Sequence, residues 1–467
     1  MAKDTKADWT ENTGSQPDCL AIRNVRAIDP ASGLDQISDI FIRDGKIAEI
    51  TPAGKSAQPA SFPGAGGAEI DGTGLAAAPG LIDVHSHFRD PGLTYKEDVT
   101  TGAAAAAAGG YTSVVCMANT KPPVDCPEVL EDLIRCERNL PVHVMNMANV
   151  TKGMKGKELT DMAALKAAGA VGFTDDGVPI LDEKLLFRAM STAAELGLPI
   201  SLHEEDPAFI RMPGVNEGAV SRRLGIGGAS ALAENVLVAR DGLLARETGC
   251  RTDIQHVSSA VSVSLIRGIK GLGADLWAEV TPQHLSLTEE AVPERGAMAR
   301  VNPPLRTEKD RQALIAGLTD GTIDMIATDH APHAAYEKAR GIISAPSGMI
   351  GLETALSLCI TNLVMPGCLT LPAVLEKMTA APARFLGISD RAGSIAPGYP
   401  ADLVLFDPAE QWTVQPADFH SKSANFPFIG ETLTGRVRMT LVGGKCVYSR
   451  AMEGKISRRA GSKPSAP

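Results

Sequence analysis

Short β-rich runs alternate with helical segments along the chain from Leu81 to about Thr328. The stretches between the runs are rich in Ala, Leu and charged residues, as in Glu183–Leu196 and Ala231–Glu247. Strands that alternate with helices form parallel sheets, so eight such units predict an α/β fold, the (β/α)8 TIM barrel. The expected strands are Leu81–His85, Ser113–Ala118, Val142–Met147, Ala170–Thr174, Pro199–His203, Thr252–His256, Leu276–Val280 and Met325–Thr328.

A low-complexity run from Gly102 to Gly110 follows the first expected strand, with six consecutive alanines inside it. Such a run could be read as a linker. Ala has the highest helix propensity of all residues, so the run is better explained as the first barrel helix.

Both flanks of this region have a different pattern, with alternating apolar and polar residues, frequent turn residues and little helix. Neither flank is large enough to build a good core alone, so we expect them to pair into one small β-sandwich formed by both chain ends. The predicted domains are the sandwich at 18–78 and 392–451, the barrel at 79–391, and polar, mobile tails at 1–17 and 452–467.

Charge and composition limit the classes of partner. The chain has 467 residues, with 45 Lys and Arg against 55 Asp and Glu, which gives a formal charge of −10. Without a basic run, no nucleic acid or membrane partner is expected, and a small molecule is the better candidate. No signal pattern is apparent, and the eight cysteines lack CxxC spacing, so we expect a cytoplasmic protein with reduced, non-catalytic thiols.

Metal-ligand residue types stand at the ends of five expected strands. In a barrel these ends meet at one rim, where active sites lie. His85 and His87 close strand one on one face of an extended segment, and single histidines close strands five and six. The full set is His85, His87, Asp175, Asp176, His203, His256, Asp329, His330 and His333.

Six of these ligands are more than one tetrahedral zinc needs, and they suit two metal ions bridged by a carboxylate and a hydroxide. We assign His85, His87 and Asp329 to the first ion and His203 and His256 to the second, with Asp176 as the bridge. Asp329 is also the expected catalytic acid and base, because it can take a proton from water and return it to a leaving nitrogen.

Several motifs in order along the chain resemble the class I dihydroorotases of the amidohydrolase superfamily. They are HSHFRDPG from His85, FTDDG, HEE, IQHVS, VNPPLR and ATDHAPH, within about residues 81–353, and the flanking IAPGYPADLVLFD also resembles the superfamily. Hydantoinase-like relatives carry a lysine on strand four, whereas this chain has Asp175 and Asp176. The 27 residues from Asp176 to His203 resemble the dihydroorotase spacing and favour Asp176 as the bridge.

The resemblance implies zinc-dependent, reversible cyclisation of N-carbamoyl-L-aspartate to L-dihydroorotate in pyrimidine biosynthesis. Arg89 offers a fork of donors that matches the substrate carboxylate. The expected substrate contacts are His87, Arg89, Asn119, Asn302, His333, Ser347 and Gly348. A homodimer and a complex with aspartate carbamoyltransferase are further expectations from the family.

Two alternatives remain at this level. One is a dihydropyrimidinase, hydantoinase or allantoinase, which the missing strand-four lysine and the presence of Arg89 disfavour. The other is a non-catalytic scaffold subunit for aspartate carbamoyltransferase, which retention of all six ligands disfavours. Of the other histidines, His143 is expected to be interior and satisfied and His420 has no evident partner. His284 is equally well explained as structural or as lying behind a ligand, and His330 is expected to lie behind the ligands.

Overall fold

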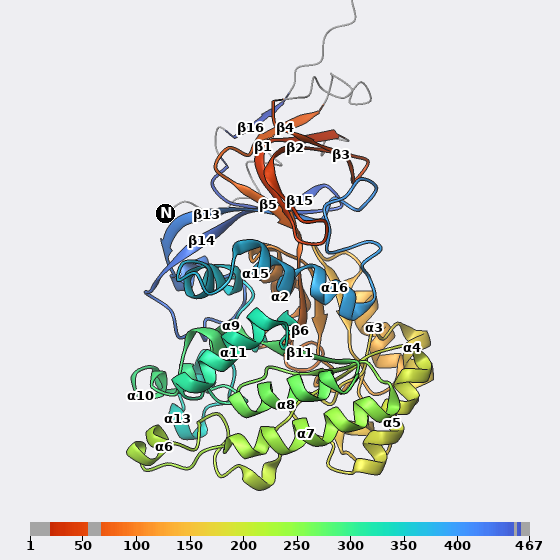
Figure 1. Cartoon of the computed structure of the whole chain (residues 1–467), viewed down its shortest axis with the longest axis vertical. Coiled ribbons are helices and arrows are strands. Elements are labelled where there is room, and N and C mark those ends of the chain that lie inside the picture. The colour runs from red at the N-terminus through yellow and green to blue at the C-terminus, as the bar shows by residue number, and fades with distance from the viewer. Residues whose placement is uncertain (1–18, 55–66, 453–454, 459–467) are drawn as a thin grey trace, which may run out of the picture.

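The computed structural model describes residues 19–54, 67–452 and 455–458. Its lower part is a barrel of parallel strands surrounded by helices, and its upper part is a sheet formed by both chain ends (Figure 1). The predicted fold class is thereby confirmed. Among the described residues, no helix combines the length and the apolar character needed to cross a membrane.

The barrel strands follow one another around the ring. β6, β7 and β8 pair in parallel, and β9, β10, β11 and β12 form a second parallel set. The fourth position is a single residue, Phe173, which bridges Ala148 on one side and Ile200 on the other. A bridge from Ser86 to His330 closes the ring. The strands are β6 (Leu81–Ser86), β7 (Tyr111–Cys116), β8 (His143–Asn146), β9 (Ile200–Leu202), β10 (Thr252–Ile254), β11 (Leu276–Val280) and β12 (Met325–Ile326).

Helices cover the outside of the ring and bury their apolar faces against it. The alanine run is the helix α2, as predicted, and the Asp98 side chain caps it by accepting from Thr100 and Thr101 amides. The main helices are α2 (Val99–Ala108), α3 (Pro127–Glu137), α4 (Met162–Ala168), α5 (Glu183–Leu196), α7 (Ala231–Thr248), α8 (Ala260–Gly271), α11 (Glu308–Asp320), α15 (Leu371–Met378) and α16 (Ala380–Leu386). Shorter elements are α6 (Ala219–Leu224), α9 (Pro282–Ser286), α10 (Ala291–Arg295), α12 (Ala335–Lys338), α13 (Gly341–Ser344), α14 (Ala355–Cys359), η1 (Lys152–Met154), η2 (Pro207–Phe209), η3 (Gly296–Ala299), η4 (Ile360–Val364) and η5 (Pro416–Asp418).

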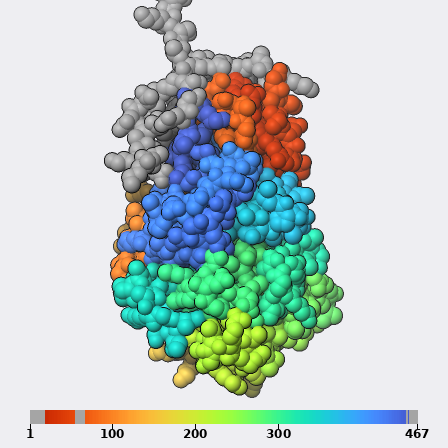
Figure 2. Space-filling view, turned by 90° about the vertical axis from the view of Figure 1, so that its left-hand side faces the viewer, coloured from red at the N-terminus to blue at the C-terminus, as the bar shows by residue number. Residues whose placement is uncertain are grey.

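The upper sheet joins strands from both flanks in the order β15-β14-β13-β5-β1-β2-β3, and β4 and β16 pair beside this path. Its central contact is the antiparallel pairing of β13 with β5, which brings Leu403 opposite Pro79. Figure 2 shows the red and orange N-terminal strands beside the blue C-terminal segment at the same end of the molecule. The strands are β1 (Cys19–Asp29), β2 (Leu34–Arg43), β3 (Lys46–Pro52), β4 (Ala68–Asp71), β5 (Ala76–Pro79), β13 (Leu403–Thr413), β14 (Thr432–Val442), β15 (Lys445–Ser449) and β16 (Ile456–Arg458).

One part of the predicted C-terminal tail belongs to this sheet. β16 lies within the range 452–467 and pairs antiparallel with β4, because its backbone satisfies an edge that β4 would otherwise leave open. The predicted N-terminal tail and residues 453–454 and 459–467 lie outside the described residues. The domain boundaries as such stay a prediction.

Candidate metal centre and active site

The six predicted ligands come together at the carboxyl ends of the barrel strands. His85 belongs to β6, and each of the others lies within three residues after a strand position of the ring. All six residues are buried, none with more than 9% of the residue's surface exposed. The set is His85, His87, Asp176, His203, His256 and Asp329.

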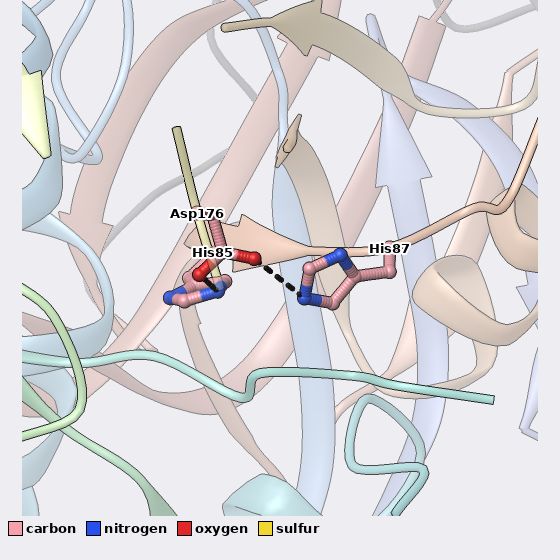
Figure 3. Close-up of side chains that lie close together, drawn as sticks. All are labelled: His85, His87 and Asp176. Atoms are coloured by element: carbon pink, nitrogen blue, oxygen red, sulfur yellow. Dashed lines mark ion pairs between the residues drawn. The ribbon is translucent and has the colours of Figure 1, made fainter. Parts of the chain in front are cut away.

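His85, His87 and Asp176 form a first cluster, whose possible ligand atoms all lie within 4.8 Å of one another. The Asp176 carboxylate lies between the two imidazoles (Figure 3). Its Oδ1 is 3.6 Å from His85 Nε2, and its Oδ2 is 3.5 Å from His87 Nε2. Each imidazole therefore faces a different oxygen of the same carboxylate.

Asp176, His203 and His256 form a second cluster that meets the same 4.8 Å limit. His203 Nδ1 lies 3.0 Å from His256 Nε2 and 3.7 Å from Asp176 Oδ1. Asp176 thus contributes to both clusters, which is the arrangement expected of a bridging carboxylate.

Asp329 lies against the first cluster. Its Oδ1 is 3.0 Å from His87 Nε2 and 3.6 Å from His85 Nε2. The backbone of Asp329 has φ 45°, and that of His256 has φ 33°. Both values lie in the left-handed region that residues other than glycine rarely adopt, so the fold holds these two side chains at the cost of local strain.

Three further side chains orient the histidines from behind. His85 Nδ1 donates to Glu279 Oε1 at 2.5 Å, and His203 Nε2 donates to Glu205 Oε2 at 3.1 Å. His87 Nδ1 lies 3.1 Å from Asn119 Oδ1. Each contact leaves the other ring nitrogen facing the clusters, as is usual for metal-binding histidines. Sequence reasoning missed Glu205 and Glu279, although Glu205 stands two residues after His203.

The charges in this centre compensate one another. Burial disfavours protonation of His85, but Glu279 and Asp176 outweigh it and raise the pKa of His85 well above its usual value. Burial would raise the pKa of Asp176, but the neighbouring histidines, His85 first, hold it well below the usual range. Burial together with His203 and His85 holds the pKa of His256 well below its ordinary value, so this ring is neutral.

These residues fit a divalent metal ion. His85 Nε2 is buried and has no hydrogen-bond partner among the described residues. It points at a carboxylate shared with two further imidazole nitrogens, and a mixture of His nitrogen and Asp oxygen is a typical donor set for Zn2+. The two clusters therefore bring together donor atoms that suit a metal ion.

Arg89 follows the ligand pair and is partly buried, with φ 60°. Its Nε donates to the carbonyl oxygen of Pro332 at 3.4 Å. Burial lowers the pKa of the guanidinium, and the charges of Asp329 and Asp176 act in the opposite direction, which places Arg89 in the field of both acids. A cation therefore stands next to the predicted metal ligands, as the sequence predicts for an anion site.

The other predicted substrate residues fall into separate groups. His333, Ser347 and Gly348 lie together: His333 Nε2 donates to the Ser347 carbonyl oxygen at 2.7 Å. A Cβ on Gly348 would come within 3.0 Å of His333 Nε2, so only glycine fits there. Asn119 contacts one of the predicted metal ligands, because its Nδ2 donates to Asp176 Oδ2 at 2.8 Å. Asn302 Oδ1 is buried and accepts no hydrogen bond within the described part of the chain.

The remaining histidines serve the fold. His284 uses both ring nitrogens within its own loop, on Thr281 Oγ1 at 2.7 Å and the Pro303 carbonyl oxygen at 3.0 Å. His330 accepts from the Gly351 amide at 3.1 Å and faces Glu97. Both therefore have structural contacts.

Two expectations about histidines need correction. His143 is not an interior residue: 55% of its side chain is exposed, and its Nε2 lies 3.0 Å from Asp402 Oδ2. The reason is that His143 begins β8, at the end of the barrel opposite the ligands. His420 has a partner after all, since its Nδ1 lies 2.9 Å from Glu353 Oε2.

Comparison with known proteins gives consistent similarities. A family model described as dihydro-orotase-like matches residues 74–262. A dihydroorotase of Clostridioides difficile is 49% identical over 430 residues, covering 92% of this chain and 100% of that protein. A dihydroorotase of Clostridium acetobutylicum is 53% identical over 379 residues, covering 81% of this chain and 89% of that protein.

Among solved structures, the L-hydantoinase (dihydropyrimidinase) from Arthrobacter aurescens superposes with a TM-score of 0.81 at 27% identity, covering 92% of this chain and 96% of that one. The dihydropyrimidinase from Brevibacillus agri superposes with a TM-score of 0.78 at 22% identity, covering 95% of this chain and 96% of that one, and this likeness concerns the fold alone.

Proposed function

Because this chain belongs to the dihydroorotase family, we propose that its two clusters hold two Zn2+ ions and that Asp329 moves the proton of the reaction. The chain is a hydrolase of cyclic amides that interconverts N-carbamoyl-L-aspartate and L-dihydroorotate, a step of pyrimidine biosynthesis. The proposal concerns how its residues carry out that activity.

The first ion is assigned to His85, His87 and Asp329, and the second to His203 and His256, with Asp176 between them. The observation that carries this proposal is the shared position of Asp176 in both clusters. Two bound Zn2+ ions would supply Lewis acidity toward the ring carbonyl and a water that ionises near neutral pH.

Asp329 is the proposed acid and base. In the hydrolytic direction its carboxylate takes a proton from the attacking water and later delivers it to the ring nitrogen that departs. The position of Oδ1, 3.0 Å from His87 Nε2 and buried, supports this role because a proton held there cannot exchange readily with bulk water. The biosynthetic cyclisation uses the same steps in reverse.

The substrate carboxylate is assigned to Arg89, whose forked donors can make two parallel hydrogen bonds to it. His87, Asn119, Asn302, His333, Ser347 and Gly348 are assigned to the rest of the substrate. For Asn119 the proposal adds a second duty, because its side chain also joins His87 to Asp176.

Quaternary structure and location stay proposals. A homodimer or a complex with aspartate carbamoyltransferase is supported by exposed apolar side chains such as Tyr95, Tyr336 and Ile343, of which 52%, 60% and 65% is exposed. Light scattering of the purified protein, alone and with the carbamoyltransferase, tests both. A cytoplasmic location is supported by the eight cysteines, all of them described and none in a disulfide.

One experiment tests the proposed function directly. The purified protein is assayed on dihydroorotate, dihydrouracil, hydantoin and allantoin, and zinc is measured on the same sample. We expect dihydroorotate to be preferred by roughly 100-fold or more in kcat/KM, because a site built around a carboxylate rejects analogues that lack it. We also expect two zinc ions per chain. A preference for hydantoin or dihydrouracil would overturn the assignment of Arg89, and a single zinc would overturn the bridge.

A further inference from the structure

Lys96 is a buried lysine close to the proposed substrate site, in the segment between β6 and α2. Only 9% of the residue is exposed. Its Nζ lies 3.1 Å from His333 Nδ1 and 3.1 Å from Glu337 Oε1. Both partners belong to the segment that follows β12, so Lys96 connects the loops of the first and last barrel strands.

The neighbours of Lys96 fasten the same two loops to each other. The Tyr95 hydroxyl donates to Glu337 Oε1 at 3.2 Å, and the Tyr95 ring stacks on Tyr336 with centroids 6.4 Å apart. Lys96 is therefore held from both sides by ordered contacts, and its ammonium has a defined position next to His333.

That position determines which nitrogen of His333 carries a proton. An ammonium group has three donors and no acceptor, so the Nδ1 atom that faces it must accept. The proton of a neutral His333 is then on Nε2, which donates to the Ser347 carbonyl oxygen at 2.7 Å. Lys96 thus leaves His333 with a single N–H donor, aimed at the loop of Ser347 and Gly348.

The same region concentrates positive charge. Burial, Arg89 and Lys96 lower the pKa of His333 to about 2, so the ring stays neutral. Burial lowers the pKa of Lys96, and repulsion from Arg89 lowers it further, whereas the hydrogen bond with Glu337 acts in the opposite direction. Arg89 and Lys96 are therefore close enough to repel each other and to act on the His333 imidazole. A bound anion would reduce this repulsion.

We propose that Lys96 is a positioning and specificity-determining residue, which holds His333 as the Nε2–H tautomer and adds a second positive charge beside Arg89 for cyclic amides that carry a carboxylate. The inference rests on the proposed role of Arg89 and His333 in substrate binding. The inference adds Lys96 to the substrate site as a residue that acts through His333 and not through the metal ligands.

The physical reason for selectivity is that the charge is costly without an anion. Glu337 is the carboxylate that contacts Lys96, and the acids whose charge reaches Arg89, Asp329 and Asp176, are committed to the proposed metal ions, so the two cations leave an excess of positive charge at the site. A carboxylate on the ligand compensates this excess, whereas a ring without a carboxylate does not. Removal of Lys96 should therefore weaken the binding of ligands that carry a carboxylate and leave the binding of the others unchanged.

The test uses the zinc-loaded protein and two planar ring analogues, orotate and uracil, which differ by one carboxylate. Their affinities are measured by calorimetry for the native protein, Lys96→Met and the control Lys422→Met. Lys422 stands in a nearby position and carries the same charge, but its Nζ binds the Thr94 carbonyl oxygen and Asp98. We expect Lys96→Met to bind orotate roughly ten- to a hundredfold more weakly, with uracil changed less than twofold, and Lys422→Met to match the native protein.

A second measurement separates positioning from packing. Protein labelled with 15N-histidine reports the tautomer of each ring, and His333→Gln identifies the signal of His333. The native protein should show the Nε2–H form. Lys96→Met removes one of the two contacts that fix this form, the other being the Ser347 carbonyl oxygen, so the share of the Nε2–H form should fall. Lys96→Gln keeps a donor toward Nδ1 but no charge, so it should retain the tautomer and still lose affinity for orotate, and it serves if the Met variant does not fold.

The possible outcomes either support or overturn the proposal. Selective loss of orotate binding with a smaller share of the Nε2–H form supports both roles of Lys96. Equal weakening of orotate and uracil, or unchanged binding of both, overturns the proposal even when the native protein hydrolyses dihydroorotate and contains zinc. If the native protein neither hydrolyses dihydroorotate nor contains zinc, the result contradicts the proposed function and not the role of Lys96.

Discussion

In the sheet formed by the chain ends, Arg26 pairs with Asp35 across β1 and β2 at 2.7 Å, with 40% and 35% of the two side chains exposed. At the barrel mouth, by contrast, Asp176 is 4% exposed and lies among three histidines. Water screens the first pair, so it contributes little to stability. The second group is costly to bury, and only its chemistry explains its presence.

The two regions also differ in backbone and packing. The sheet buries a continuous apolar cluster that includes Leu403 and Leu441. The mouth holds His256 and Asp329 at positive φ and leaves His85 Nε2 with no hydrogen-bond partner among the described residues. The comparison teaches that the sheet is built for stability, whereas the mouth gives up stability for a set of fixed donors.

The largest expected effect is on catalysis at the mouth. Asp329→Asn should reduce turnover by roughly a thousandfold or more, because an amide cannot carry the proton and is a poorer ligand. Steady-state rates on dihydroorotate measure this. The matched control is Asp39→Asn in the sheet, where the carboxylate pairs with Arg23 at 2.9 Å, and this variant should keep full activity. A rate within tenfold of the native protein would remove Asp329 from its role.

The adjacent acids Asp175 and Asp176 allow the same comparison, between a residue that serves stability and one that serves chemistry, at neighbouring positions. Asp176→Ala should remove most bound zinc, because this carboxylate belongs to both clusters. Asp175→Ala should keep zinc but lower the free energy of unfolding by roughly 3 kcal/mol, because Asp175 accepts from the backbone amides of Val150 and Thr151.

Metal analysis and denaturant unfolding on both variants of this pair check the prediction. If Asp175→Ala loses as much zinc as Asp176→Ala, the bridge is assigned to the wrong acid.

Arg89→Lys should keep the zinc and lose the two-pronged contact with the substrate carboxylate. One charge-assisted hydrogen bond is worth about 1.5–3 kcal/mol, so kcat/KM for dihydroorotate should fall roughly ten- to more than a hundredfold. Any trace turnover of dihydrouracil should stay the same. A uniform loss on both substrates would mean that Arg89 serves the metal centre or the fold.

A core substitution in the sheet should have the opposite profile. Leu403→Ala removes a fully buried side chain from the apolar cluster and should lower the free energy of unfolding by roughly 2–5 kcal/mol. The kcat/KM of the folded fraction should not change. Chemical unfolding and kinetics on the same sample measure both, and a large loss of kcat/KM would show that the sheet shapes the active site.

The smallest expected effect concerns pH. Burial, with Arg300, lowers the pKa of Lys338 from its usual 10.5 to about 7 in the folded protein. Between these two values the unfolded chain binds the proton more strongly, so the contribution of Lys338 to stability rises as pH increases. The stability of the native protein minus that of Lys338→Met should increase by roughly 1–2 kcal/mol between pH 7 and 9. A flat or falling difference would contradict the shift.

The local pattern of the sequence was enough to predict the barrel and the types of residue at its rim. β11 begins and ends as predicted, at Leu276 and Val280, and α5 covers the predicted Glu183–Leu196. Strand four was harder to predict, since the expected Ala170–Thr174 is reduced to bridges at Phe173. The pattern located this strand, but how many of its residues pair with the neighbouring strands depends on packing against those neighbours and not on its own residues.

Sequence by itself therefore determined the fold class and where metal-ligand side chains cluster, because strand periodicity and the chemistry of strand ends are properties of short segments. Only the tertiary structure decided which atoms face each other. His85 meets Glu279 across 194 residues of chain, and Lys96 meets His333 across 237. Such pairs depend on the closure of the ring and on the direction of each side chain at its rim, and no spacing along the chain records either.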